Sequence, residues 1–404
     1  MPSRLGLGRL VAVAVAVVVV VAGVVWWVRG SGGTGSGGTG ATSGPWQVYP
    51  GAFETQGGYR DGPDVLVAEP DGCYVGFGTD SGPMGVGPGY WRATGDCTDP
   101  ASVTPGRRPL GDGPPSDDRA GVVIAVAAHG GGFLTVVRNR YFGDAYAYDS
   151  SVRRGSPSGG WKAIAEFRTD TPRESHIGPV ALVPVERGYV AVGHRERDPV
   201  AWTSRTGTSW REVALPLPSG RRGTVTGLVE GPAGQLVAVG TVGAVGASHP
   251  AGWRSSDGGR TWRLVTMPDL EGGSRLTSVV HNGHQYLAFG AMGGNLGAAA
   301  LALDSADGRR WEFDDRLARA GARYIMAVVA TVDGTVYAIS ADSRTNWRKG
   351  EDTWCGMAWR LANGRWAAEP LGCRGIPTTL VALPDGRVAG AHWETLFLRP
   401  SSAS

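Results

Sequence analysis

Seven short segments of one form recur along this chain and constrain its fold more than any other feature. Each segment is rich in Val, Ala, Gly and aromatic residues, and a Gly lies one to three positions before it. Their first residues are 47 to 60 positions apart. The segments span residues 73–79, 133–139, 189–195, 236–242, 286–292, 336–342 and 387–393. Because self-similarity at such a spacing is typical of repeat architectures, we interpret each segment as one strand of a repeated unit.

The surroundings of each segment supply three further strands. Asp-Gly or Asn-Gly occupies four of the turns before the segments, and such pairs are the strongest short signal for a β-hairpin. An apolar run precedes the turn, as at 65–68, 122–127, 180–185 and 379–383. Trp often marks the third strand (Trp91, Trp202, Trp253, Trp359) and the fourth (Trp161, Trp210, Trp262, Trp311, Trp366). Four antiparallel strands repeated around an axis form the blades of a β-propeller.

The two ends of the repeat complement each other. The seventh unit has only three strands and ends near residues 396–399. Residues 45–50, Pro-Trp-Gln-Val-Tyr-Pro, look like an isolated fourth strand, comparable to residues 210–216. Pairing them with the last unit would close the ring and leave no open sheet edge. We therefore predict an all-β fold for residues 45–404: a seven-bladed β-propeller of four-stranded antiparallel blades, with the N-terminal strand closing the last blade.

One hairpin carries a motif that other proteins share. Residues 255–262 follow the pattern S-x-D-x-G-x-T-W, with a turn of residues that bond their own backbone or tolerate positive φ. This pattern resembles the Asp-box of BNR-repeat propellers, a set that includes sialidases; its residues here are Ser255, Asp257, Gly259, Thr261 and Trp262. Degraded copies lie at 203–210, which keeps the spacing with Arg205 at the Asp position, at 305–311 and at 360–366. The resemblance implies that the box joins the third and fourth strands, on the face opposite the usual binding site, and has a structural role.

The N-terminus predicts a membrane anchor. Residues 10–28 are nineteen uncharged, mostly apolar residues, enough to span a bilayer as a helix. Arg4 and Arg9 precede them and Arg29 follows, so the positive-inside rule places residues 1–9 in the cytoplasm. Residues 29–44 form a flexible Gly/Ser/Thr linker, and residues 45–404 lie outside the cytoplasm. The alternative is a signal peptide cleaved near Ala22, which would release a secreted domain.

The four cysteines fall into two local pairs, Cys73 with Cys97 and Cys355 with Cys373. An even count in an exported domain favours two disulfides, and we expect nearest-neighbour pairing. A zinc site is the alternative, but no Cys-x-x-Cys motif or nearby His supports it.

Charge argues against nucleic acid as a partner. The only charged residues before residue 45 are three arginines, so the remainder carries 36 basic and 36 acidic side chains. It has no stripe of Lys and Arg with interleaved aromatics. The seven His residues have no ligand spacing, so we expect neither a metal nor a cofactor. We expect a monomer.

The resemblance to sialidases raises the question of catalysis. It implies three arginines on a substrate carboxylate, a Tyr nucleophile paired with Glu, and an Asp acid/base. Residues 59–63 lie where the first arginine motif is expected, but their spacing differs from it. Tyr324, Glu174 and Asp118 are candidates by location only, and no G-x-S-x-G or HExxH motif is present. We therefore assign no catalytic residue and keep a sialidase-like glycoside hydrolase as the alternative function.

A second resemblance favours binding over catalysis. Residues 189–193 and 236–240, together with the turn at 257–262, are similar to the blade repeats of photosystem II assembly factors and related exported bacterial propellers. These proteins bind a partner polypeptide and are not enzymes. We therefore expect a membrane-anchored, extracytoplasmic, non-catalytic binding or assembly module for a protein or an anionic glycan. A purely structural envelope protein without a ligand is a third interpretation.

One Arg recurs ahead of the innermost strand of every unit. Each lies 11 to 16 residues before the second strand, in the loop that leads into the blade. The set is Arg60, Arg119, Arg173, Arg222, Arg275, Arg323 and Arg374. Guanidinium groups bind carboxylate or phosphate in bidentate fashion, so the ring predicts an anion site. The alternative is that these arginines pair with local acids. The acids are Asp61, Asp117, Asp118, Glu174 and Asp315.

Overall fold

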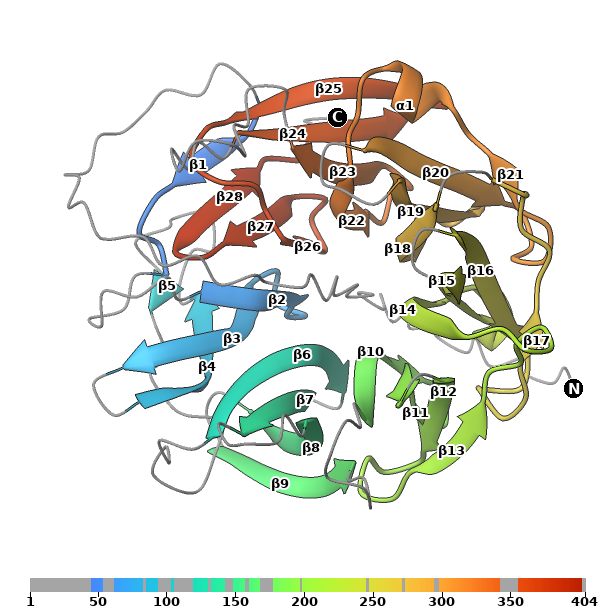
Figure 1. The fold of residues 1–404 in the computed structure, drawn as a ribbon. Coiled ribbons are helices and arrows are strands. Elements are labelled where there is room, and N and C mark those ends of the chain that lie inside the picture. The colour runs from blue at the N-terminus through green and yellow to red at the C-terminus, as the bar shows by residue number, and fades with distance from the viewer. Residues whose placement is uncertain are drawn as a thin grey trace, which may run out of the picture.

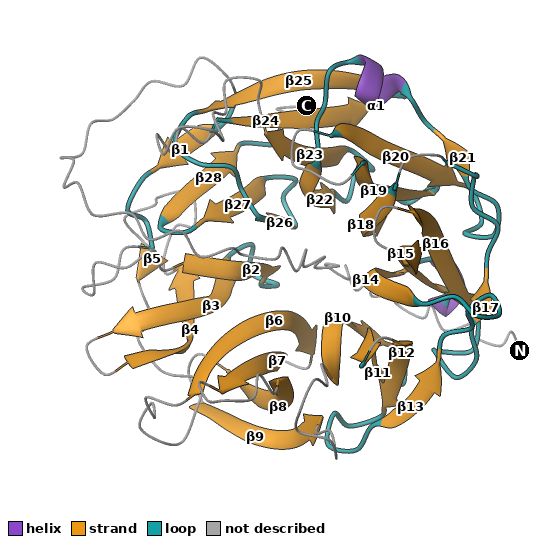
Figure 2. Ribbon diagram, viewed as in Figure 1, coloured by secondary structure: helices purple, strands orange, loops and turns teal. Residues whose placement is uncertain are grey.

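The chain forms a ring of seven four-stranded antiparallel sheets, as a computed structural model shows (Figure 1). The structure describes residues 45–53, 62–82, 85–93, 103–104, 119–129, 132–141, 148–156, 160–167, 177–196, 198–244, 247–270, 273–293, 298–341 and 355–401. Within these ranges nearly all regular structure is β-strand (Figure 2). The predicted seven-bladed propeller is therefore confirmed.

Blades 1 to 6 each run in sequence order from an inner first strand to an outer fourth strand. Blade 1 contains β2 (Gly62–Ala68), β3 (Tyr74–Gly82), β4 (Gly85–Ala93) and β5 (Val103–Thr104). Blade 2 contains β6 (Arg119–His129), β7 (Gly132–Tyr141), β8 (Tyr148–Ser156) and β9 (Gly160–Phe167). Blade 3 contains β10 (Ile177–Val185), β11 (Gly188–Arg195), β12 (Asp198–Ser204) and β13 (Arg211–Ala214).

The next three blades follow the same plan. Blade 4 contains β14 (Gly223–Glu230), β15 (Leu236–Ala244), β16 (Ala247–Ser255) and β17 (Arg263–Leu264). Blade 5 contains β18 (Arg275–His281), β19 (Tyr286–Met292), β20 (Ala299–Ser305) and β21 (Glu312–Phe313). Blade 6 contains β22 (Ile325–Ala330), β23 (Val336–Ala341), β24 (Gly356–Ala362) and β25 (Arg365–Gly372). Two single-turn helices, a 3₁₀ turn at Pro232–Gly234 and α1 at Arg316–Arg319, lie in the connections.

Blade 7 closes the ring as the sequence predicted. Its strands are β26 (Thr379–Ala382), β27 (Val388–His392), β28 (Thr395–Arg399) and, as the fourth strand, β1 (Gln47–Tyr49). β1 is antiparallel to β28, with Gln47 opposite Leu398 and Tyr49 opposite Leu396. The seven recurring segments are the second strands of the blades, β3, β7, β11, β15, β19, β23 and β27.

The core consists of seven separate clusters of buried apolar side chains, one between each pair of neighbouring blades. Between blades 3 and 4, for example, Val190 and Val192 pack with Trp253 and Trp262. Because each sheet is covered on both faces by its neighbours, its inner strands read as continuous apolar runs rather than as an alternation. This explains the Val- and Ala-rich segments from which the repeat was recognised.

Six of the seven first strands carry a β-bulge at an equivalent place, which the sequence analysis did not predict. The register shifts after Pro63, Val123, Pro179, Val225, Leu276 and Ile325. In blades 4 and 5 the bulged residue is Thr. The Thr226 hydroxyl lies 3.0 Å from the Leu276 carbonyl of blade 5, and the Thr277 hydroxyl lies 3.4 Å from the Ile325 carbonyl of blade 6. These bulges therefore join neighbouring inner strands.

Cys355 and Cys373 form a disulfide, as predicted, and link the start of β24 to the residue after β25. Cys73 is also disulfide-bonded, and Cys97 lies outside the described residues. The predicted cytoplasmic segment, anchor and linker, residues 1–44, lie outside them too. Among the helices of the described ranges, none is long and apolar enough to cross a membrane.

Candidate functional site

The antiparallel blades give the ring two faces with different connections. We call turn face the side that carries the turns between first and second strands and between third and fourth strands. We call loop face the side that carries the connections between blades and between second and third strands. Contacts join turns of adjacent blades on the turn face: the Gln235 side chain donates to the Asp307 carbonyl at 2.8 Å. Ser401 lies beside the Gly386 turn, so the C-terminal end of blade 7 is on the turn face.

The Ser255–Trp262 turn of blade 4 is held by its own side chains. Asp257 Oδ1 accepts from the backbone N–H groups of Arg260 and Thr261 at 3.0 and 2.9 Å, and Oδ2 accepts from the Thr261 hydroxyl at 2.6 Å. The Ser255 hydroxyl accepts from Gly259 N–H, and the Trp262 indole donates to the Gly259 carbonyl at 3.0 Å. Partial burial raises the pKa of Asp257, but the hydrogen bonds from Thr261, Ser255 and Arg260 outweigh it and lower the pKa.

Blades 3 and 5 repeat the serine contact. Ser204 accepts from Gly207 N–H at 2.8 Å, and Ser305 accepts from Gly308 N–H at 2.9 Å. The prediction that residues 203–210 keep the full motif spacing is therefore wrong. Ser204, rather than Thr203, occupies the serine position, and the turn is one residue shorter than that of blade 4. Two adjacent hydroxyl residues made the register ambiguous in the sequence.

Each of these three turns packs on the preceding blade. A Cβ placed on Gly207, Gly259 or Gly308 would lie within 3.0 Å of a side chain in the second strand of that blade. The contacted side chains occupy equivalent positions in their second strands; they are Leu134, Val190 and Val237. Their partners in the adjacent third strands are, in the same order, Arg154, Thr203 and Arg254. The contacts of the Ser255–Trp262 turn thus stay within the fold.

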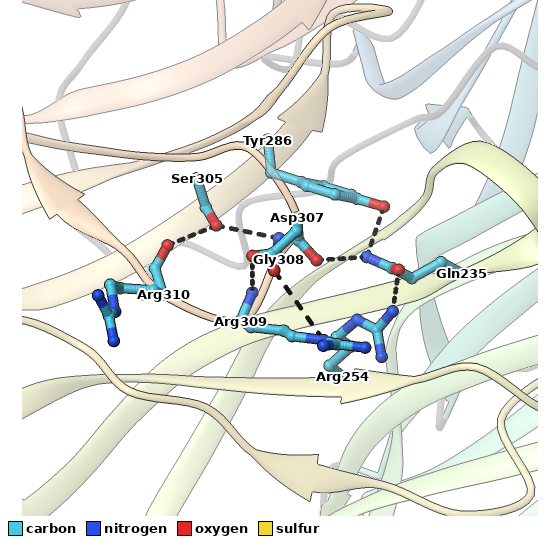
Figure 3. A network of polar contacts seen from close by, with 8 residues as sticks. All are labelled: Gln235, Arg254, Tyr286, Ser305, Asp307, Gly308, Arg309 and Arg310. Carbon is cyan, nitrogen blue, oxygen red and sulfur yellow. Dashed lines mark hydrogen bonds and ion pairs between the residues drawn. The ribbon is translucent and has the colours of Figure 1, made fainter.

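Figure 3 shows the junction at which the Ser305 turn of blade 5 packs on blade 4. The Gln235 amide donates to the Tyr286 hydroxyl at 2.9 Å, and Arg254 donates to the Gln235 carbonyl oxygen. Burial raises the pKa of Tyr286 to about 12, against the opposing effects of Arg254 and Gln235. A phenol in this environment stays protonated at neutral pH. The network joins blades and provides no ionised nucleophile.

The loop face holds the arginines that the sequence singled out. Arg119 and Arg275 begin the first strands of blades 2 and 5, and Arg222, Arg323 and Arg374 lie one to five residues before those of blades 4, 6 and 7. Arg60 and Arg173 lie outside the described residues. The side chains of Arg222, Arg323 and Arg374 are exposed. The structure therefore places three exposed arginines on one face, near the inner strands.

Local acids do not account for all of these arginines. Asp315, proposed above as a local partner of these arginines, forms an ion pair with Arg319. Within the described ranges, no ion pair is formed by Arg222 or Arg374. The other proposed partners, Asp61, Asp117, Asp118 and Glu174, are outside those ranges.

Arg275 and Tyr324 meet on the same face. The Arg275 guanidinium lies over the Tyr324 ring, 5.0 Å from its centroid, and Tyr324 is buried. Burial raises the pKa of Tyr324, and Arg275 only partly offsets this. Among the described residues no carboxylate accepts from its hydroxyl, and Glu174 and Asp118 are not described. Within the described ranges, Tyr324 therefore contacts Arg275 and no carboxylate.

A hollow of about 360 Å³ opens on the loop-face end of blade 4. The connection to β14, the facing ends of β15 and β16, and the residues around β17 form its walls. It is lined by Pro218, Arg221, Val242, His249, Pro250, Ala251, Leu264, Val265, Met267, Pro268 and Asp269. The sequence analysis missed it; the prolines at 218, 250 and 268 were its only local signal. In the described part of the chain, no group of three or more His, Cys, Asp or Glu could hold a metal ion.

Comparisons with known proteins show a shared fold. No family model matches the chain, and no curated protein matches its sequence. Solved structures with 10–15% identity nevertheless share its architecture, which confirms the similarity of fold to photosystem II assembly factors and to sialidase-like propellers.

Three of these structures illustrate the range of functions on this fold. YCF48 bound to a D1 peptide has a TM-score of 0.56 at 11% identity, over 90% of this chain and 99% of YCF48. A GH74 enzyme of Niastella koreensis has a TM-score of 0.55 at 15% identity, over 85% of this chain and 53% of the enzyme. Sqt1 of Chaetomium thermophilum, bound to the N-terminus of ribosomal protein L10, has a TM-score of 0.50 at 10% identity, over 85% and 98%. This chain thus spans about half the length of the GH74 enzyme.

Proposed function

We propose that this protein is a non-catalytic binding or assembly module that captures a protein or an anionic glycan on its loop face. The observation that carries this proposal is the set of exposed arginines beside the inner strands, two of which form no ion pair within the described ranges. Guanidinium groups held on one face at blades 4, 6 and 7 suit a ligand with several carboxylates or sulfates. The peptide-bound propellers YCF48 and Sqt1 lend support, because they bind polypeptides on the same fold.

The proposed location follows from the N-terminal sequence. Residues 10–28 would anchor the chain with its N-terminus in the cytoplasm and the propeller outside, through the linker at 29–44. β1 begins beside the end of β28, which lies on the turn face. The linker would therefore leave from the turn face. The arginines of the loop face would then point away from the membrane. Protease added to intact cells should then degrade the propeller while residues 1–28 stay in the membrane. A propeller found in the medium would contradict the anchor.

The binding test compares two triple variants of the full-length protein, with poly-L-glutamate and heparin as probes. The loop-face variant combines Arg222→Glu, Arg323→Glu and Arg374→Glu. The matched control combines Arg187→Glu, Arg205→Glu and Arg260→Glu, which are exposed and lie on the turn face. We expect the loop-face variant alone to lose binding, and the wild-type affinity to fall with added salt. Equal losses in both variants, or no binding by the wild type, would contradict the proposal.

The alternative function is a glycoside hydrolase, since the solved structures with this fold include the GH74 enzyme. The contact between Arg275 and Tyr324 is the feature that would serve it. Turnover of a fluorogenic sialoside that is lost in Tyr324→Phe would establish catalysis and overturn the non-catalytic assignment.

A further inference from the structure

The hollow of blade 4 has the chemistry of a site for an apolar side chain. Apart from Arg221, His249 and Asp269, its lining side chains are aliphatic, Pro or Met. A sugar chain needs many hydrogen-bonding partners or an aromatic platform, and the lining has few of the former and no aromatic residue. Pro218, Pro250 and Pro268 have fixed φ, so the walls are formed before a ligand arrives. The hollow therefore favours a polypeptide over a glycan.

Leu264 is the exposed apolar residue at this site. Its relative exposure is 40%. Among all described residues, it is one of only four large hydrophobic residues that are exposed. It lies in β17, a fourth strand of only two residues, so little backbone of this outer strand is offered for pairing. Met267 turns inward beside it: its methyl group occupies the space that Gly252 leaves without a side chain. An apolar ligand side chain would thus cover Leu264 and contact Met267.

The charges at the hollow indicate what flanks that side chain. Arg221 lines the hollow, and Arg222 follows it at the start of blade 4. Neither forms an ion pair with a described residue. The single carboxylate of the lining, Asp269, is 97% exposed and lies 3.5 Å from His249 Nδ1, not beside an arginine. A ligand carboxylate is therefore attracted to the arginine side.

We infer that the blade 4 hollow binds an acidic polypeptide segment by an apolar anchor residue, which covers Leu264 while a neighbouring carboxylate pairs with Arg221 and Arg222. This inference rests on the proposed function and narrows its ligand from a protein or anionic glycan to an acidic peptide. Electrostatic attraction brings the segment to the loop face, and the apolar contact selects among anionic ligands.

The test uses two fluorescein-labelled hexapeptides and fluorescence anisotropy with the full-length protein. One has two central leucines between acidic residues, and the other has serines in place of the leucines. We expect the leucine peptide to bind about tenfold more tightly, because burial of an apolar side chain contributes an effect of that order. Leu264→Ser should remove most of this preference and leave the serine peptide unaffected. Arg221→Glu should weaken both peptides.

Matched controls distinguish binding in the hollow from non-specific binding to exposed apolar or charged side chains elsewhere. Phe313→Ser changes a residue that is 39% exposed and lies in the equivalent two-residue strand of blade 5. Arg260→Glu reverses an exposed charge on the turn face. Both should bind the peptides as the wild type does. Met267→Ser provides a second change in the hollow, and circular dichroism checks that each variant is folded.

The outcomes distinguish this inference from the proposed function. Equal affinity for both peptides, lost with the loop-face arginines, would leave the proposed function intact and overturn the hollow as an anchor site. A loss of preference in Phe313→Ser as large as in Leu264→Ser would overturn it too. Absence of binding to either peptide, together with heparin binding, would assign the loop face to glycans.

Discussion

Asp257 adds hydrogen bonds to a turn whose serine contact recurs in other blades. Its two oxygens accept four hydrogen bonds from Ser255, Arg260 and Thr261. Blade 3 has Thr206 in place of this Asp, yet Ser204 keeps the serine contact and the turn still closes. The carboxylate is therefore an addition to a turn that the serine and glycine already define.

Replacing Asp257 should make stability depend less on pH. The pKa of Asp257 is lowered in the folded state, so its contribution is present above the unfolded pKa of about 3.9 and is lost as the pH falls through the folded value. We expect Asp257→Asn to lower the free energy of unfolding by about 1 kcal/mol at pH 7. Urea denaturation from pH 7 to pH 3 measures the difference between the wild type and Asp257→Asn, which should shrink below about pH 4. A difference that is constant over this range would contradict the assignment.

At the scale of the element, the sequence predicted strands better than their junctions. The second strands and the closing strand β1 were located correctly because apolar runs and Gly turns are local signals. The bulges in the first strands, the serine register at Ser204 and the hollow of blade 4 were not predicted. Each of these depends on where a neighbouring strand or blade lies. Contacts across blades join residues such as Gly259 and Val190, whose pairing no local pattern reveals.

Two adjacent glycines of the blade 4 turn test this packing. Gly258 and Gly259 both have positive φ, at 72° and 83°, so alanine strains the backbone at either position. A Cβ on Gly258 meets nothing within 4 Å, whereas one on Gly259 lies 3.0 Å from Val190 of blade 3. We expect Gly258→Ala to cost about 1 kcal/mol of unfolding free energy and Gly259→Ala about 1–3 kcal/mol more. Urea denaturation measures both; equal costs would show that the turn does not pack on blade 3.

For the whole molecule, closure of the ring joins residues from the two ends of the chain. Glu369 of blade 6 accepts from the Trp46 indole at 2.9 Å and from Arg399 of blade 7 at 2.9 and 3.1 Å. The Arg399 and Glu369 side chains are each only 9% exposed, and Arg399 lies over the Tyr337 ring at 5.0 Å. The repeat count predicted that the ends meet. It gave no sign that Trp46 donates to Glu369, because these two residues are 323 positions apart.

Breaking this pair should weaken the closure. Glu369→Gln leaves the Arg399 guanidinium buried without an anion, and we expect it to lower the free energy of unfolding by about 3–5 kcal/mol. Asp315→Asn is the matched control, because it breaks a pair with Arg319 whose side chains are 39% and 77% exposed, and it should cost about 0–1 kcal/mol. The double variant Glu369→Leu, Arg399→Leu removes both buried charges and should be more stable than Glu369→Gln alone. Urea denaturation followed by tryptophan fluorescence compares the three. If Glu369→Gln unfolds like the control, the ion pair does not stabilise the closed ring, and closure depends on the β1–β28 pairing and its apolar contacts.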